Sequence, residues 1–178
     1  NSMLNQIGKW KIFPLETGDF RLDGGAMMGS VPKVLWEKTN PADGLNRIDL
    51  SLRCLLLDDG ENRVLIDTGL GTKGSDKFKT IFHIVQPENP LKNALNKIGF
   101  SPKDVTHVIF SHLHFDHAGG ATELNQDGVP VPVFPNAEYF ITESQWKQAI
   151  QPNSRDMASF MQADFLPLQE AGLLQLIP

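Results

Sequence analysis

The sequence SHLHFDHAGG, residues 111–120, decides how this chain is interpreted. Three of the five histidines and one aspartate fall within the six positions 112–117, directly after the apolar run 105–110. A short apolar run that ends in polar residues and glycine is typical of a buried strand. The sequence therefore predicts that the chain leaves a sheet and opens into a cluster of side chains that can bind a metal.

The spacing within this cluster predicts a site for two cations. Side chains alternate on an extended backbone, so His112 and His114 point the same way and can bind one cation. Asp116 and His117 follow where the chain must turn, and because they are adjacent we expect them to diverge, which suits a second cation beside the first. Imidazole and carboxylate without thiolate favour Zn²⁺, with Mn²⁺, Fe²⁺ and Co²⁺ as alternatives.

A structural role is the alternative for this cluster. A histidine after a strand is usually a hydrogen-bonded structural residue, and a tract rich in histidine can bind metal adventitiously. Titratable groups packed this closely at the end of a strand would, however, be costly to remove from water without a cation. The sequence therefore favours a metal site.

The pattern H-x-H-x-D-H, residues 112–117, resembles the signature of the metallo-β-lactamase superfamily. The run VLIDTGLG, residues 64–71, resembles the D-T-G turn that precedes it in that superfamily. The segment FRLDGGAMMG, residues 20–29, resembles the N-terminal loop of the branch with N-acyl-homoserine lactone lactonases and related esterase-like hydrolases. The resemblance implies an α+β fold, the four-layer αβ/βα metallo-β-lactamase sandwich.

The resemblance also implies roles for individual residues. His112 and His114 would hold the first ion, and Asp116 and His117 the second. A hydroxide shared by the two ions would attack an ester-like carbonyl, and Asp116 would pass a proton to the leaving alkoxide. Asp67 would lie beside the cluster and accept a hydrogen bond from a ligating histidine. Met27 could touch the substrate or simply fill a gap in the core.

A lactone or carboxyl ester is the preferred small-molecule substrate, because of the resemblance over residues 20–29. A glyoxalase II-like thioesterase and a phosphotriester hydrolase remain alternatives with the same ligands. A different class also stays open, a non-catalytic metal-binding or interaction module of the same fold. A panel of lactones, thioesters and phosphotriesters would separate the enzymes, and any activity would exclude the module.

The resemblance covers only the N-terminal part of the family's domain. A complete two-metal site needs a further histidine, a bridging aspartate and one more histidine, and neither His83 nor His107 matches those positions. We therefore expect residues 3–178 to be the N-terminal part of a single domain, with the first sheet and the start of the second. Such a piece, whether a fragment, a cleavage product or a degenerate half-domain, is expected to be inactive alone and to leave apolar edges exposed.

Composition sets outer limits on function. The 178 residues are 40% hydrophobic, carry a formal net charge of −5 and include one cysteine, Cys54. The acidic balance disfavours a nucleic-acid partner, and no apolar stretch approaches the ~20 residues of a membrane span. We expect a cytoplasmic protein, a possible homo-oligomer, with Asn1 and Ser2 as a cloning remnant. Cys54 lies in an apolar run and is expected to be a buried thiol without a role.

Apolar periodicity predicts the order of elements along the chain. Strands are expected at 7–15, 48–54, 64–66, 105–110, 131–134, 139–142 and 173–177. Helices are expected at 32–38, 76–85, 90–98, from Gly120 to Leu124, 142–150, 154–165 and 167–171. His107 falls within a strand and His83 off the apolar stripe of its helix, so both are expected to be structural or surface residues.

Overall fold

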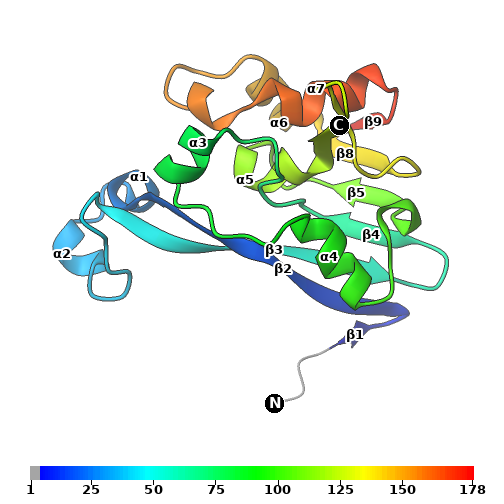
Figure 1. Ribbon diagram of the computed structural model, residues 1–178, viewed down its shortest axis with the longest axis horizontal. Helices are drawn as coiled ribbons and strands as arrows, with labels where there is room; N and C mark the ends of the chain where they lie inside the picture. The colour runs from blue at the N-terminus through cyan, green and yellow to red at the C-terminus, as the bar shows by residue number, and fades with distance from the viewer. Residues whose placement is uncertain (1–4) are drawn as a thin grey trace.

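A computed structural model describes residues 5–178, and its described strands form one seven-stranded sheet and one two-stranded sheet (Figure 1). The expected remnant at residues 1–2 lies outside the described residues. The strands of the large sheet, in spatial order, are β1 (Gln6–Ile7), β2 (Trp10–Asp23), β3 (Arg47–Asp58), β4 (Arg63–Ile66), β5 (His107–Ile109), β8 (Glu138–Thr142) and β9 (Leu174–Ile177). The pairs from β1 to β4 are antiparallel, and the pairs from β4 to β9 are parallel.

The strand expected over residues 7–15 is longer than predicted. Strand β2 continues through Pro14 to Asp23 and pairs with β3 along its length, with a register shift between Glu16 and Gly18. Proline stops a strand where its missing N–H is needed, but β1 pairs only with Trp10 and Lys11, so Pro14 lies where β2 is an edge strand. The segment 20–29 is therefore the end of a strand followed by helix α1 (Gly24–Met28).

One face of the large sheet carries the main core. Helix α4 (Pro90–Lys97) packs on β2, and α6 (Glu143–Ile150) packs on β8 and β9 (Figure 1). Helix α7 (Gln162–Glu170) packs on the small sheet, β6 (Thr122–Leu124) and β7 (Pro130–Pro132). The strands point fully buried side chains toward this layer, including Leu56, Leu65, Val108 and Tyr139.

Several predicted elements differ from the structure. Helix α3 (Asp76–Ile81) begins at the expected cap Ser75 but ends early, because His83 has a positive φ of 43°. The helix expected from Gly120 to Leu124 is a 3-10 turn, η2 (Gly119–Ala121), followed by strand β6. The helix expected over 154–165 is a short 3-10 turn, η3 (Met157–Ser159), followed by α7, which runs through Pro167. Strand β9 extends the large sheet beside β8, so it does not begin a second sheet.

The opposite face of the large sheet is apolar but open among residues 5–178. A groove of about 310 Å³ crosses it, and Leu55 and Ile109 are 38% and 39% exposed. In β9, Leu176 and Ile177 are 42% and 43% exposed, whereas Leu174 and the preceding Leu173 are partly buried against the main core. The described part of the chain also contains no helix that is long and apolar enough to cross a membrane.

Candidate metal centre

The parallel pairing of β4 and β5 places the predicted site. Parallel strands present their carboxyl ends at the same edge of a sheet, so the residues that follow them meet there. Asp67 follows β4, and its N–H donates to the carbonyl of Ile109 at 2.9 Å, which continues the ladder by one step. Ser111 and His112 follow β5, and helix α5 (Phe115–Ala118) begins after His114. Both segments are therefore fixed by the core.

Histidine rings gather at this edge. The ring centroids of His112 and His114 lie 4.6 Å apart, and those of His112 and His117 lie 4.0 Å apart. Ligand atoms of His112, Asp116 and His117 all lie within 4.8 Å of one another. The rings of His112 and His114 are therefore neighbours, but His114 is not part of the group of three ligand residues.

The expected divergence of Asp116 and His117 is wrong. Oδ2 of Asp116 lies 3.3 Å from Nε2 of His117, so the two adjacent side chains converge. Both residues stand in the short helix α5, where successive side chains project about 100° apart and can lean toward a common point. The carboxylate and the imidazole nitrogens consequently form one compact group.

Asp67 contacts this group through His117 and Ser111. Its Oδ1 accepts the N–H of Ser111 at 2.9 Å, and its Oδ2 accepts the hydroxyl of Ser111 at 2.8 Å. The same Oδ2 lies 2.9 Å from Nδ1 of His117. With Nδ1–H of His117 donated to Asp67, Nε2 faces the cluster and lies 3.3 Å from Oδ2 of Asp116.

The charges of the site shift its pKa values in opposite directions. Burial alone would lower the pKa of His117, but hydrogen bonds to Asp116 and Asp67 raise it to about 9. Burial, together with the neighbouring imidazoles for His112, lowers the pKa of His112 and His114. For Asp116 and Asp67 burial acts upward, yet hydrogen bonds and the charge of His117 lower the pKa of both. Ionised carboxylates thus face the histidines.

The turn that follows α5 is held by close backbone packing. The N–H and the hydroxyl of Thr68 both donate to the carbonyl of His117, each at 2.7 Å. A Cβ atom at Gly119 or Gly120 would collide with the carbonyl oxygens of Leu70 and Thr68. The two glycines therefore allow the segment after Asp67 to lie against the end of α5.

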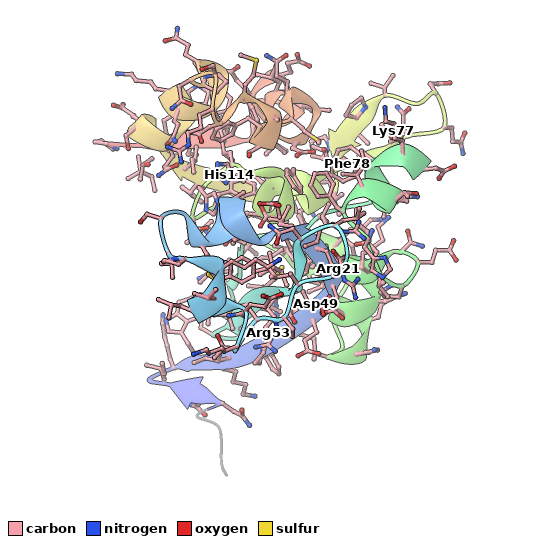
Figure 2. The ribbon with its side chains drawn as sticks, turned by 90° about the vertical axis from the view of Figure 1, so that its left-hand side faces the viewer. Arg21, Asp49, Arg53, Lys77, Phe78 and His114 are labelled. Carbon is pink, nitrogen blue, oxygen red and sulfur yellow. The ribbon has the colours of Figure 1, made fainter. Side chains whose placement is uncertain are left out.

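Three phenylalanine side chains, Phe78, Phe82 and Phe115, form an aromatic wall at helix α5, and a fourth, Phe160, reaches the cluster. Phe115, between two predicted ligands in sequence, packs with Phe78 and Phe82 of the α3 region at ring distances of 5.4 and 5.1 Å. The ring of Phe160 lies 4.7 Å from that of His114. Figure 2 faces this end of the molecule and shows His114 and Phe78 at a similar level above the Arg21–Asp49 ion pair, whose atoms lie 2.6 Å apart.

Helix α1 carries Met27, which the sequence suggested as a contact for substrate. Met27 is 47% exposed, so it is free of the core. The double glycine before it has a packing reason, because a Cβ atom at Gly24 would collide with the indole ring of Trp36. Asp23 caps the helix by accepting the N–H of Ala26 at 2.8 Å.

Sequence reasoning missed three residues that contact the cluster. Ser111 links Asp67 to Nδ1 of His112, which lies 3.1 Å from its hydroxyl, and its position just before the H-x-H pattern was an available signal. Thr68 follows Asp67 in the D-T-G turn and could have been found in the same way. Phe160 lies more than forty residues downstream in the sequence, and only the tertiary fold brings it to His114.

The donor set fits a divalent cation. Zinc binds imidazole nitrogen and carboxylate oxygen at ~2.0–2.2 Å, so a spacing within 4.8 Å lets small side-chain rotations bring three donors to one ion. Asp67 and Ser111 supply the partners that orient ligating imidazoles in metal sites. His83 is exposed and His107 lies on the open face, so both match the surface and structural roles expected of them.

Fold and site together define a family. The family model described as the metallo-beta-lactamase superfamily matches residues 49–168, and the chain belongs to that family. This confirms the resemblance and the fold that it implied.

Relatives within the family include lactonases. The chain is 34% identical over 119 residues to an N-acyl homoserine lactonase of Bacillus sp., with 60% of this chain and 46% of that protein covered. It is 32% identical over 117 residues to the N-acyl homoserine lactonase AiiB of Agrobacterium fabrum, with 61% of this chain and 42% of that protein covered. The chain thus spans about half the length of these curated relatives.

Solved structures extend the likeness to nearly all of the chain. A probable metal-dependent hydrolase from Staphylococcus aureus matches with a TM-score of 0.84 at 32% identity, over 97% of this chain and 60% of that one. The dizinc quorum-quenching lactonase AidC matches with a TM-score of 0.71 at 22% identity, over 97% and 60% of the two chains. The second match bears on the fold alone.

Proposed function

We propose that the protein containing this chain is a metal-dependent hydrolase that opens lactones or cleaves carboxyl esters. The observation that carries the proposal is the compact group of His112, Asp116 and His117, with Asp67 hydrogen-bonded beneath it. Membership of the metallo-β-lactamase superfamily and identity of 32–34% to lactonases support the choice of substrate.

The chain offers ligands for two divalent cations, for which zinc is the favoured identity. We assign His112 and His114 to one ion and Asp116 and His117 to the other. Because ligand atoms of His112, Asp116 and His117 lie within 4.8 Å of one another, the two proposed ions would be neighbours. When bound, such ions lower the pKa of water and polarise a carbonyl oxygen.

The protein's own residues orient these ligands and move the proton. Asp67 and Ser111 hold Nδ1 of His117 and His112, which leaves each Nε2 toward the cluster. Burial acts to raise the pKa of Asp116, but the hydrogen bond to His117 and the charge of His117 lower it overall, so this carboxylate is ionised and can accept a proton. Asp116 is therefore the group that takes a proton from the attacking water and passes it to the leaving alkoxide.

The surroundings suit an ester with an apolar acyl group. The ring of Phe160 lies 4.7 Å from that of His114, and Met27 offers an adaptable apolar side chain. Such surfaces bury a hydrocarbon chain without a demand for particular hydrogen bonds. We include Met27 as a substrate contact, acting through its exposed side chain on α1.

The test is a substrate panel with the purified, zinc-loaded full-length protein. Lactones and carboxyl esters should be hydrolysed faster than thioesters and phosphotriesters. Asp116→Asn should remove activity, while the matched control Asp127→Asn, an exposed turn residue, should leave it unchanged. Preferred hydrolysis of thioesters or phosphotriesters would replace the substrate assignment, and zinc binding without turnover of any member would indicate a binding module.

A further inference from the structure

A buried ion pair lies on the far side of the turn that follows α5. Nζ of Lys73 is 2.9 Å from Oδ1 of Asp164, and the two side chains are 10% and 3% exposed. Lys73 belongs to the segment after the D-T-G turn, and Asp164 to helix α7. A pocket of about 140 Å³ adjoins the pair and is otherwise lined mainly by apolar side chains, including Leu70, Phe115 and Met161. The pair therefore lies between the core and the aromatic wall.

Lys73 makes more than the ion pair. Its ammonium group also donates to the carbonyl of Gly119 and, at 3.0 Å, to the carbonyl of Thr122. An ammonium has three N–H donors, so all three are used. Two of the three acceptors are backbone carbonyls, that of Gly119 directly after α5 and that of Thr122 at the start of β6.

Asp164 depends on Lys73 for its charge. Its Oδ2 is buried without a hydrogen-bond partner among the described residues. Burial raises the pKa of Asp164, and Lys73 acts against that rise. A second bond, from the hydroxyl of Thr122 to the carbonyl of Ala163 at 2.7 Å, ties the same turn to α7. The pair thus joins three segments at one point.

The free-energy cost of burying the Lys73–Asp164 ion pair suggests that the pair has a function beyond stability. Removing two charges from water is expensive, and well-packed apolar residues often give equal or greater stability in the same place. What apolar residues cannot do is donate hydrogen bonds to the carbonyl groups of Gly119 and Thr122. Lys73 is therefore better explained by those carbonyls than by stability.

We propose that Lys73 and Asp164 are a positioning pair for the metal-ligating helix, in which Asp164 holds Lys73 in place while Lys73 fixes the carbonyl of Gly119. Thr68 already holds the carbonyl of His117, two residues earlier. Two carbonyls at the end of α5, those of His117 and Gly119, are then fixed from one segment, which sets the direction of Asp116 and His117. The proposal rests on the proposed function in that these two side chains are metal ligands.

The test compares single and double substitutions in the full-length protein. Lys73→Met and Asp164→Leu each leave a buried charge without its partner, so each should lower the melting temperature markedly. The double variant Lys73→Met/Asp164→Leu removes both charges, and the adjoining pocket gives room for the larger side chain. Its melting temperature should return close to that of the wild type.

Metal affinity then separates positioning from stability. In the double variant the carbonyls of Gly119 and Thr122 still lack their donor, so zinc affinity measured by competition with a chelator should remain about 10-fold lower, within the range for groups that orient ligands. The matched control is Lys92→Met/Glu123→Leu, an ion pair of 2.8 Å between helix α4 and strand β6 with side chains 37% and 35% exposed. The control should leave both melting temperature and zinc affinity unchanged.

Amide hydrogen exchange gives a readout that needs no metal. The N–H of Thr68 donates to the carbonyl of His117, and the N–H of Gly120 to that of Gly69 at 3.1 Å. Both amides should exchange faster in the metal-free double variant than in the wild type, while amides of α4 keep their protection.

The outcomes are distinct. A stable double variant with wild-type zinc affinity and wild-type exchange at Thr68 and Gly120 would overturn the positioning role. A double variant that does not fold would overturn it as well, because the pair would then be needed for the core. If the wild-type protein bound no metal, the proposed function would fail, and the exchange of Thr68 and Gly120 would still decide whether the pair fixes the turn.

Discussion

The histidines within strand β5 and after its end have different surroundings. His107 begins the strand, with its ring stacked on Phe140 at 5.8 Å and Nδ1 2.7 Å from the hydroxyl of Thr106. His112 and His117 come after the strand has ended, close to one another and near two carboxylates. His107 has an aromatic and a hydroxyl neighbour, whereas the cluster concentrates donors of the kind that bind cations.

The difference shows that position relative to a strand end decides the role of these side chains. A side chain within the ladder faces one side of the sheet and meets the neighbouring strands. Residues beyond the carboxyl ends of β4 and β5 leave the ladder at the same edge, where Asp67 and His117 meet at 2.9 Å. We therefore expect substitutions in the cluster to change metal affinity and substitutions of His107 to change stability only.

The largest effect is expected from loss of a ligand. His117→Ala should reduce zinc affinity by more than the ~10–100-fold typical of groups that orient ligands, because a donor itself is removed. The melting temperature of the metal-free protein should change far less than the affinity. Calorimetric titration with zinc measures the first quantity, and unchanged affinity would remove His117 from the site.

A smaller effect is expected at Asp67. Asp67→Asn keeps the shape of the side chain but removes the charge beside His117, so zinc affinity should fall ~10–100-fold. Asp67→Ala should lose the same affinity and also about 1 kcal/mol of stability, because residue 67 has a φ of 59°, which asparagine and aspartate tolerate better than alanine. Chelator competition and urea unfolding separate the two effects.

The control for Asp67 is Asp127→Asn, an exposed residue in a turn far along the chain. It should change neither zinc affinity nor stability measurably. Equal affinity in Asp67→Asn and Asp127→Asn would show that Asp67 only shapes its turn.

How much of this site the sequence predicts can be read from the same residues. The pattern at 112–117 and the D-T-G turn identify the cluster and Asp67, because a local motif fixes spacing and both lie at strand ends. The contact between Asp116 and His117 was not predicted, since it depends on the one-turn helix α5. Phe160 and Asp164 reach this region only through the packing of α7, which no local pattern encodes.

In the fold, too, elements set by local sequence patterns were predicted, and elements set by tertiary contacts were missed. The strand over 48–54, which continues to Asp58, and the helix with Pro90 at its first position were predicted, because apolar periodicity and the preference of proline for a helix start are local. The extension of β2 through Pro14 was missed, since a proline is tolerated only because the neighbouring strand β1 is short. Whether 122–124 forms a strand depends on pairing with β7, which is a tertiary event.

A modest effect is expected at His107. His107→Gln should leave zinc affinity unchanged and cost about 0.5–1.5 kcal/mol of stability through the lost stacking on Phe140. Urea unfolding measures the second quantity. A fall in zinc affinity comparable with that of His117→Ala would erase the distinction between the two kinds of histidine.

The smallest effect is expected at Cys54. Its thiol is 3% exposed, and burial followed by the charge of Asp67 raises its pKa to about 12. The thiol should therefore resist alkylation in the folded protein at neutral pH and react on unfolding, and Cys54→Ala should keep zinc affinity unchanged. Rapid labelling of the native protein would mean that this part of β3 opens to solvent.

The most direct test of the proposed metal site is an anomalous difference map, recorded at the X-ray absorption edge of zinc from crystals of the zinc-loaded full-length protein. We predict peaks at the edge of the sheet beyond β4 and β5. The imidazole nitrogens of His112, His114 and His117 and a carboxylate oxygen of Asp116 should lie at ~2.0–2.2 Å from zinc. Asp67 should accept the remaining N–H of His117 without touching an ion. Absence of a peak there, or zinc bound at His83 or His107 instead, would show that the cluster is not the metal site.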